Sequence, residues 1–301
     1  MALPLQSTKQ KKENIMKKTL VALFFALTLI FTACGNSDPV AKDTESTAPE
    51  SSAAQEASTG TEQQTIKIGV SPVPHAEIVE NVKENLAKRG ITLEIVTFDD
   101  YVIPNQALAS GEIDANFFQH VPYLEAFKKE NNLKLVSIGA VHLEPLAAYS
   151  AKYKSLEELP EGGKVLIPND VSNGARALLL LAKHNLIKLD DPTNINVTEA
   201  NITENPKKLT FVPMEAAALA RTYQDADLAL INSNYALEEN LNPIKDNLVI
   251  EDKDSPYANI VAVREGEENE EKFKILMEEL QSETVKKFIN DKYQGAIVPA
   301  F

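Results

Sequence analysis

Apolar and polar residues alternate along short stretches of the chain, and longer stretches with a helical period separate them. The stretch TIKIGVS at residues 65–71 alternates apolar and polar side chains, which is typical of a strand with one buried face. The stretch AEIVENVKENLAKRG at residues 76–90 has a helical pattern and ends at a glycine, as many helices do. The pattern then returns to a strand, TLEIVTF, at residues 92–98.

The same order of strand and helix continues towards the C-terminus. Further strands are predicted at residues 113–118, 133–141, 164–168, 209–214, 227–231, 248–252 and 259–265. Further helices are predicted at residues 104–111, 122–132, 174–185, 217–223, 270–282 and 283–293. Because strands and helices alternate at this spacing, the pattern predicts βαβ units and a mainly parallel sheet, an α/β fold.

Two stretches share one layout: ALASGEIDANFFQHVPYLEA at residues 107–126 and ALARTYQDADLALINSNYALEE at residues 218–239. Each has a short Ala/Leu helix, an acidic turn, a strand that begins with Asp, and a polar turn where a tyrosine enters a helix. Ligands of open α/β sheets bind at the carboxyl ends of strands. The likeness therefore predicts two similar lobes with a shared crevice, although ordinary βα alternation is the alternative explanation.

The N-terminal stretch has the pattern of an export signal. Lys17 and Lys18 precede the apolar run TLVALFFALTLIFTA at residues 19–33, which ends directly at Cys34. The run is too short for a comfortable membrane span of ~20 residues and matches a signal peptide. FTAC resembles the bacterial lipobox, in which the cysteine is lipidated, so residues 1–33 are predicted to be removed. A buried free thiol is the alternative for this cysteine.

Two further predictions concern the N-terminal region. The MKK at residues 16–18 is typical of a translation start, so we expect synthesis to begin at Met16. Residues 35–65 contain no aromatic residue and a single valine, too little apolar surface to offset ordering. Residues 34–65 are therefore predicted to be a lipidated cysteine followed by a disordered tether, with the acyl chains anchoring the protein at a membrane.

Charge and composition narrow the possible partners. The formal net charge is −14, and removal of the lysine-rich signal would make it more negative. Such a protein is repelled by nucleic acid and by anionic lipid surfaces. The chain has one cysteine, so it cannot form an intrachain disulfide.

The chain shows no familiar catalytic pattern. It has no GxSxG, P-loop or GxGxxG motif, and its four histidines, His75, His120, His142 and His184, show no HxH or HExxH spacing. Only the first three histidines lie near predicted strand ends. The sequence therefore predicts a protein that is not an enzyme and has no cofactor and no metal.

Polar residues at two predicted helix starts suggest amino-acid recognition. Arg176 begins an apolar helix beside Asn173, where a guanidinium and free helix N–H groups can bind a carboxylate. A surface arginine or an inter-lobe salt bridge is the alternative. Asn232 and Asn234 follow a buried strand and can accept from an ammonium or donate to a carboxylate. Helix capping is their alternative role, and it suits Asn234 better than Asn232.

Aromatic residues accompany these polar groups. Tyr101 follows the second predicted strand and can face the turn at residues 116–123 across one sheet edge. Phe117 and Leu124 are expected in the core. His120 would be costly to bury without a partner, which favours a place at a cleft.

Several long motifs resemble a known family. They are FDDYVIPNQALASGEIDANFFQHVPYLEAF, IPNDVSNGARALLLL, ALINSNYALE and the C-terminal KYQGAIVPAF. The chain from about residue 65 to 301 resembles the methionine-binding lipoproteins of the NLPA type, the substrate-binding components of methionine ABC importers. Where the family commonly has TNEGR this chain has SNGAR, so the choice of ligand stays open.

The resemblance implies a two-lobed periplasmic-binding-protein fold, each lobe a mixed, mainly parallel sheet flanked by helices. Lobe 1 is expected to comprise residues 66–145 and 252–301, and lobe 2 residues 146–251. By motif position, a thioether pocket is implied for Tyr101, Phe118, His120 and Tyr123. Arg176 resembles the carboxylate ligand, and Asn173, Asn232 and Asn259 resemble polar contacts to the amino acid's backbone groups.

The resemblance also implies a function and partners. The protein is expected to capture L-methionine and deliver it to an ABC permease and its ATPase. A methionine-containing dipeptide or another small apolar amino acid is the alternative ligand. We expect a lipid-anchored monomer at the extracytoplasmic face of the cell membrane.

Overall fold

The computed structural model describes residues 63–252 and 255–301. The predicted signal peptide, the start at Met16, the lipidation of Cys34 and the tether up to residue 62 lie outside the described residues. Among the residues that are described, no helix is long and apolar enough to cross a membrane.

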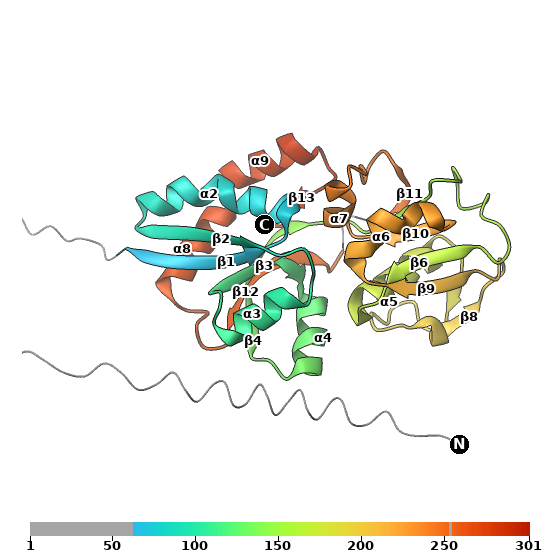
Figure 1. Ribbon diagram of the computed structural model, residues 1–301, viewed down its shortest axis with the longest axis horizontal. Helices are drawn as coiled ribbons and strands as arrows, with labels where there is room; N and C mark the ends of the chain where they lie inside the picture. The colour runs from blue at the N-terminus through green and yellow to red at the C-terminus, as the bar shows by residue number, and fades with distance from the viewer. Residues whose placement is uncertain (1–62, 253–254) are drawn as a thin grey trace, which may run out of the picture. The chain divides into compact units, whose positions relative to one another are not determined.

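The first sheet has six strands in the order β13-β4-β12-β3-β1-β2 (Figure 1). Its strands are β1 (Gln64–Val70), β2 (Ile91–Thr97), β3 (Ala115–His120), β4 (Leu135–Leu143), β12 (Ala258–Arg264) and β13 (Val298–Pro299). Strand β1 pairs in parallel with β2 and β3, whereas β12 is antiparallel to both β3 and β4. The chain therefore leaves this sheet after β4 and returns to its middle with β12.

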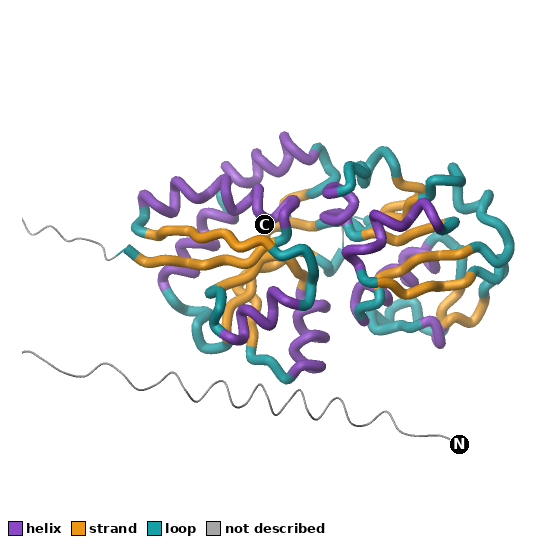
Figure 2. The backbone as a smooth tube through the Cα atoms, viewed as in Figure 1, coloured by secondary structure: helices purple, strands orange, loops and turns teal. Residues whose placement is uncertain are grey.

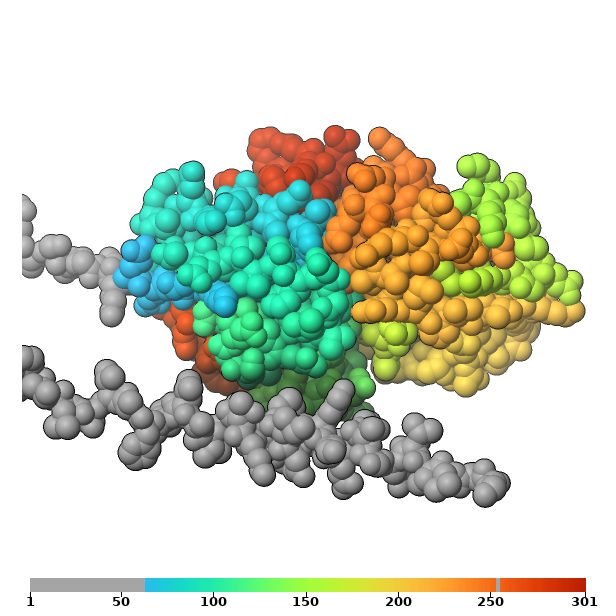
Figure 3. Space-filling model, in the orientation of Figure 1, coloured from blue at the N-terminus to red at the C-terminus, as the bar shows by residue number. Residues whose placement is uncertain are grey.

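Helices cover both faces of this sheet, as the tube in Figure 2 shows. They are α2 (Glu77–Lys88), α3 (Ile103–Ser110), α4 (Val121–Asn131), α8 (Glu271–Leu280) and α9 (Glu283–Tyr293). Buried residues of α2, α8 and α9 share one core cluster, and those of α3 and α4 pack in others. Because α8 and α9 pack beside α2, the red C-terminal end lies against the blue-to-teal N-terminal end in Figure 3.

The second sheet has five strands in the order β11-β5-β10-β6-β9. They are β5 (Ala147–Tyr149), β6 (Lys164–Pro168), β9 (Thr210–Met214), β10 (Leu228–Ile231) and β11 (Asn247–Ile250). The apolar residues of α5 (Val171–Lys183) form a core on one face. Helices α6 (Ala216–Thr222) and α7 (Ser233–Glu238) contribute to a second core cluster.

Minor elements complete the described chain. They are β7 (Lys188–Leu189), β8 (Ile202–Glu204) and the short helical turns η1 (Pro72–Ala76), η2 (Glu199–Asn201) and η3 (Tyr223–Asp225). Strands β7 and β8 pair as a separate two-stranded sheet.

The predicted α/β fold with mixed sheets is confirmed. The sheets are not mainly parallel, because in the two large sheets four strand pairings are parallel and five are antiparallel. Strands β5, β7, β8 and β13 were not predicted, because two or three residues are too few to show a strand period. The lobe boundaries at residues 145/146 and 251/252 stay a prediction, although the first sheet uses residues 64–143 and 258–299 and the second uses residues 147–250.

Candidate functional site

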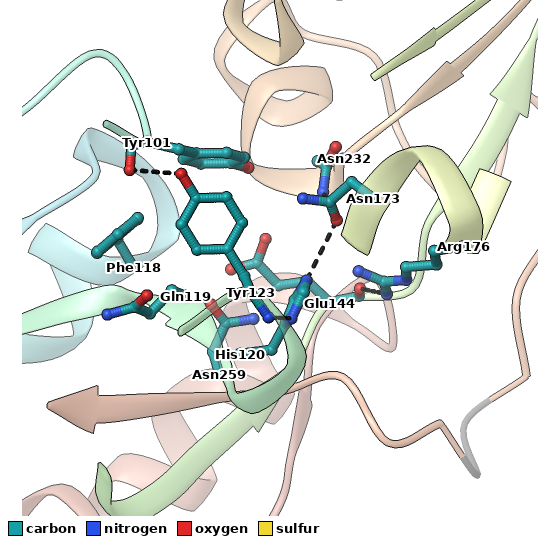
Figure 4. A pocket seen from close by; sticks show the side chains of 10 residues that line it. All are labelled: Tyr101, Phe118, Gln119, His120, Tyr123, Glu144, Asn173, Arg176, Asn232 and Asn259. Atoms are coloured by element: carbon teal, nitrogen blue, oxygen red, sulfur yellow. Dashed lines mark hydrogen bonds between the residues drawn. The ribbon is translucent and has the colours of Figure 1, made fainter. Parts of the chain in front are cut away.

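One pocket collects side chains from both sheets. Its empty volume is about 300 Å³, including space open to solvent. Figure 4 shows the residues that line it: Tyr101, Phe118, Gln119, His120, Tyr123, Glu144, Asn173, Arg176, Asn232 and Asn259. All eight predicted binding residues are among them. Gln119 and Glu144 are the two that the sequence did not indicate.

Three aromatic rings form one wall of the pocket. The ring centroids of Tyr101 and Phe118 are 5.8 Å apart, those of Tyr101 and Tyr123 are 5.8 Å apart, and those of Phe118 and Tyr123 are 6.0 Å apart. These spacings are typical of favourable aromatic pairs. In Figure 4 the rings lie on the side of the pocket opposite Asn232 and Arg176.

Adjacent phenylalanines of β3 have different surroundings because successive strand residues point to opposite faces, and β3 also contains a bulge at this place. In the pairing of β12 with β3, Ile260 lies opposite Gln119 and Val261 opposite Phe117, so Phe118 is an extra residue. Bulges of this kind change the direction of a side chain. Phe117 is fully buried in the core of the first sheet, whereas Phe118 lines the pocket. The prediction that Phe117 and Leu124 are core residues is confirmed.

His120 caps the helix that follows β3. Its Nδ1 accepts the backbone N–H of Tyr123 at 3.2 Å, so Nε2 must hold the proton that is donated to Oδ1 of Asn173 at 3.2 Å. Burial, and then the charge of Arg176, lowers the pKa of His120 to about 3. His120 is therefore buried with partners, as a neutral imidazole whose two nitrogens are both used.

The side-chain amide of Asn173 connects His120, Asn232 and Asp170. Its Oδ1 accepts from His120 and from Nδ2 of Asn232 at 3.0 Å, and its Nδ2 donates to both carboxylate oxygens of Asp170. Asp170 is in turn the N-cap of α5. Because both ends of the Asn173 amide are bonded within the protein, its geometry here is that of a residue that positions its neighbours.

Asn232 has one unused acceptor. Its Oδ1 is buried and has no hydrogen-bond partner among the described residues. An orphan acceptor of this kind costs free energy unless a ligand or water donates to it. Asn232, and not Asn234, occupies the N-cap position of α7, so the expected assignment of these two roles is wrong. The side chain of Asn232 nevertheless makes no capping bond and is left for the pocket.

Arg176 is buried and ion-paired, so it is not a surface arginine. Its Nε and Nη2 donate to the carboxylate of Glu251 at 2.5–3.1 Å, and Nη2 also donates to the backbone oxygen of Glu144 at 2.7 Å. Its guanidinium lies 4.4 Å from the ring centroid of Tyr257. Burial is the largest single influence and acts to lower the pKa of Arg176, but the charge and hydrogen bonds of Glu251, together with Tyr257 and Glu144, raise the pKa overall.

The remaining guanidinium nitrogen of Arg176 is available. Within residues 63–252 and 255–301, Nη1 has no hydrogen-bond partner, although the side chain is only 2 % exposed. Since Arg176 lines the pocket, the Nη1 group is a donor for an anion there. The salt bridge that the sequence left open as an alternative thus coexists with a free donor.

Glu144 supplies a carboxylate that the sequence did not indicate. It directly follows β4 and is 5 % exposed, and its Oε2 accepts the backbone N–H of Asn234 at 3.1 Å. Burial raises the pKa of Glu144, and the charges of His75 and Arg176 act against that rise. Its position three residues beyond a predicted strand was the only available signal. Gln119 bonds to Asn105 and Asn116 away from the pocket centre.

Two more histidines converge on Glu144. Candidate ligand atoms of His75, His142 and Glu144 all lie within 4.8 Å of one another, close enough to hold a metal ion. A histidine that ligates a metal through one nitrogen almost always donates the other N–H to a partner. Nδ1 of His75 and Nδ1 of His142 are buried and have no partner in the described structure. The residues present therefore fit a hydrogen-bonded cluster better than a metal site.

The pocket is complementary to a zwitterion with an apolar side chain. Nη1 of Arg176 can bind a carboxylate, while Oδ1 of Asn232 and the carboxylate of Glu144 can accept from an ammonium. The aromatic wall offers apolar contact. Two mixed α/β sheets that share such a pocket define the class as the two-lobed periplasmic-binding-protein fold.

The chain belongs to the NlpA lipoprotein family, whose model matches residues 66–301. It is 44 % identical over 239 residues to the methionine-binding lipoprotein MetQ of Bacillus subtilis, covering 78 % of this chain and 87 % of that protein.

Solved structures agree with this membership. The structure of a nutrient binding protein from Burkholderia cenocepacia bound to methionine matches with a TM-score of 0.75 and 44 % identity, over 78 % of this chain and 100 % of that chain. An ABC transporter periplasmic substrate-binding protein from Coxiella burnetii matches with a TM-score of 0.75 and 43 % identity, over the same shares of the two chains.

Proposed function

We propose that this protein binds L-methionine between its two sheets and delivers it to an ABC permease and the ATPase of that importer. The observation that supports this best is the pocket, where donors for a carboxylate, acceptors for an ammonium and an aromatic wall face one space. The names of the relatives support the ligand and the transport role.

The carboxylate of methionine is assigned to Arg176. Nη1 is the guanidinium nitrogen without a partner in the described residues, and a charged hydrogen bond contributes about 1.5–3 kcal/mol. Glu251 and Tyr257 hold the rest of the guanidinium, which limits the entropy lost on binding.

The ammonium is assigned to Asn232 and Glu144. Oδ1 of Asn232 is an orphan acceptor, and Glu144 provides the negative charge. Asn259 lies beside them with its Oδ1 bonded to Nε2 of His75 at 3.0 Å, so its Nδ2 is the group left to contact the ligand. Asn173 acts on the ligand through Asn232.

The thioether is assigned to the aromatic wall. Sulfur contacts with aromatic rings contribute about 0.3–1.5 kcal/mol each beyond apolar burial. Tyr101, Phe118 and Tyr123 are held around one space, and His120 closes it with a neutral ring.

The proposal includes a lipid anchor at Cys34, a place at the extracytoplasmic face of the cell membrane, a monomeric state and no catalytic activity. The lipoprotein relatives and the lipobox-like FTAC sequence support the anchor and the location.

A methionine-containing dipeptide is the second candidate ligand. A groove of about 1090 Å³, including open solvent, lies on α5 and shares Arg176 with the pocket. Tyr257 and Glu251 also line this groove. A second residue of a dipeptide would extend past Arg176 into it.

Calorimetry on the full chain in detergent, unfolded and refolded to remove ligand, tests the proposal. We expect methionine to bind with micromolar or tighter affinity, and more tightly than methionyl dipeptides. Absence of such binding would overturn the proposed function, and a preference for dipeptides would move it to the second candidate. Alanine and D-methionine are the matched ligands for side-chain and stereochemical selectivity.

A further inference from the structure

A buried cluster lies directly behind the pocket. His75 comes from η1 and His142 from the end of β4, and both are fully buried. Nε2 of His142 lies 2.7 Å from Oε1 of Glu144, and Nε2 of His75 lies 3.2 Å from the same oxygen. Neither histidine lines the pocket.

The hydrogen-bond pattern fixes the protonation of the two rings. An ionised carboxylate only accepts, so Nε2 of His142 must be the donor to Oε1 of Glu144. Nε2 of His75 donates its single proton to Oδ1 of Asn259 at 3.0 Å, so its 3.2 Å approach to Oε1 is a contact and not a second hydrogen bond. The two Nδ1 atoms have no partner among the described residues and are therefore bare lone pairs, since a buried unpaired N–H would cost more. Burial lowers the pKa of His75 to about 4 and that of His142 to about 3, which is consistent with neutral rings.

Packing holds the rings in place. The ring of Phe117 makes edge contacts with His75 at 4.7 Å and with His142 at 5.2 Å. The two imidazoles themselves are 4.9 Å apart. The imidazole rings of His75 and His142 are therefore preorganised beside Glu144, and their positions depend on the core rather than on a ligand.

We propose that His142 is a positioning residue that donates to one oxygen of Glu144, so that its other oxygen faces the ligand's ammonium, while His75 holds Asn259 beside it. This inference rests on the proposed function. Oε2 accepts one backbone N–H from Asn234 and keeps a free lone pair for the ligand. The two donors, His142 and the backbone of Asn234, favour the charged form of this buried carboxylate and fix its direction. A negative charge in that place separates an amino acid from the same molecule without its amino group.

Two ligands and three variants test the proposal in the full chain. The ligands are L-methionine and 4-(methylthio)butanoate, which is methionine without its amino group. In the His142→Leu variant we expect methionine affinity to fall roughly ten- to a hundredfold, the loss of one charged hydrogen bond. The affinity for the deaminated ligand should stay within about threefold, because it makes no ammonium contact.

The conservative variant separates positioning from folding. His142→Gln keeps an N–H donor near Glu144 and should recover most of the methionine affinity, and the exposed His184→Leu is the matched control. Equal losses for both ligands in His142→Leu, or no recovery in His142→Gln, would overturn the proposal. Methionine affinity that is lost in EDTA and restored by Zn²⁺ would also overturn it, in favour of a metal site.

A ligand-free measurement keeps the inference distinct from the proposed function. Nitrogen-15 NMR of the imidazoles should show Nε2–H tautomers for His75 and His142, and the His142 signal should shift in Glu144→Gln. Nδ1–H tautomers would overturn the inference alone. A wild-type protein that binds no methionine would overturn the proposed function and, with it, the ligand-facing role of Glu144.

Discussion

The two strand-to-helix turns that flank the pocket have the same plan and different chemistry. His120 is the N-cap of α4, and Asn232 is the N-cap of α7. Three residues after each cap is a tyrosine, whose hydroxyl donates to a backbone oxygen of the segment 99–101: Tyr123 to Tyr101 at 2.8 Å, and Tyr235 to Asp99 at 3.4 Å.

The difference lies in what each cap leaves unbonded. Both nitrogens of His120 are used inside the protein, so its turn offers the ligand aromatic and neutral surface. Asn232 makes no capping bond and keeps a free Oδ1. The two turns thus share one scaffold. Under the proposed function, the first turn is assigned to the side chain of the ligand, and the second, with Arg176, to the groups that all amino acids share.

The largest effect is expected from Arg176→Ala. This change removes the guanidinium that is proposed to bind the ligand's carboxylate beside the second turn. Methionine affinity should fall by at least ~1.5–3 kcal/mol, and stability should also fall because Glu251 loses its buried partner. Titration calorimetry and thermal melts measure the two losses. The exposed Arg221→Ala is the control, and unchanged affinity in Arg176→Ala would place Arg176 outside the site.

The pH dependence of stability tests the first turn. The folded pKa of His120 is lowered to about 3 from 6.5, so its contribution is complete above pH ~6.5 and is lost as pH falls towards 3. In that window each such histidine changes stability by up to about 1.4 kcal/mol per pH unit. His120→Asn keeps a capping side chain without the titrating ring and should show a flatter profile.

Urea unfolding between pH 7 and pH 4 measures this difference. His75 and His142 remain in both proteins, so the difference between profiles belongs to His120. Parallel profiles for wild type and His120→Asn would contradict the neutral, buried state of this ring. The exposed His184→Asn should follow the wild type.

Ligand selectivity distinguishes the two turns more finely. Asn232→Ala should weaken methionine and alanine by similar amounts, about 0.5–1.5 kcal/mol, because both ligands carry the ammonium. His120→Ala should weaken methionine more than alanine, because only methionine extends its side chain to that wall. Calorimetry with both ligands on both variants gives the comparison, and equal losses in His120→Ala would argue against a side-chain role.

Many residues of this site could be predicted from the sequence because they belong to local sequence patterns. An apolar helix that begins with Asn173 and Arg176 indicates a polar group at a buried helix start, and the paired layouts indicate two turns facing one crevice. The structure brings those groups into one pocket. Strand alternation already places Phe117 and Phe118 on opposite faces. The bulge at Phe118 depends on pairing with β12, which is more than 130 residues away, so no local pattern shows the bulge.

Glu144 and its partners could not be predicted for the same reason. The groups that contact it come from η1, β4 and the start of α7, which lie far apart in the sequence and meet only in the folded chain. The bond between Arg176 and Glu251 is also long-range, and Glu251 follows a strand without any distinctive spacing. Long-range hydrogen bonds of this kind depend on which strands and helices lie side by side. The hydrophobic pattern of the sequence predicts the strands and helices but not their neighbours.

The smallest effect is expected at the contact between Tyr101 and the second turn. The hydroxyl of Tyr101 donates to Oδ1 of Asn234 at 2.5 Å, and its ring packs on Tyr235 at 4.9 Å and on Tyr123 at 5.8 Å. Tyr101→Phe removes the bond and keeps all three rings. Because the bond joins the segment before α3 to α7, its loss should weaken methionine by about 0.5–1.5 kcal/mol if ligand binding and this contact stabilise the same arrangement. Calorimetry on Tyr101→Phe measures it beside the control Tyr153→Phe, a partly buried tyrosine outside the pocket. An unchanged affinity would show that the aromatic wall works without this link between the two turns.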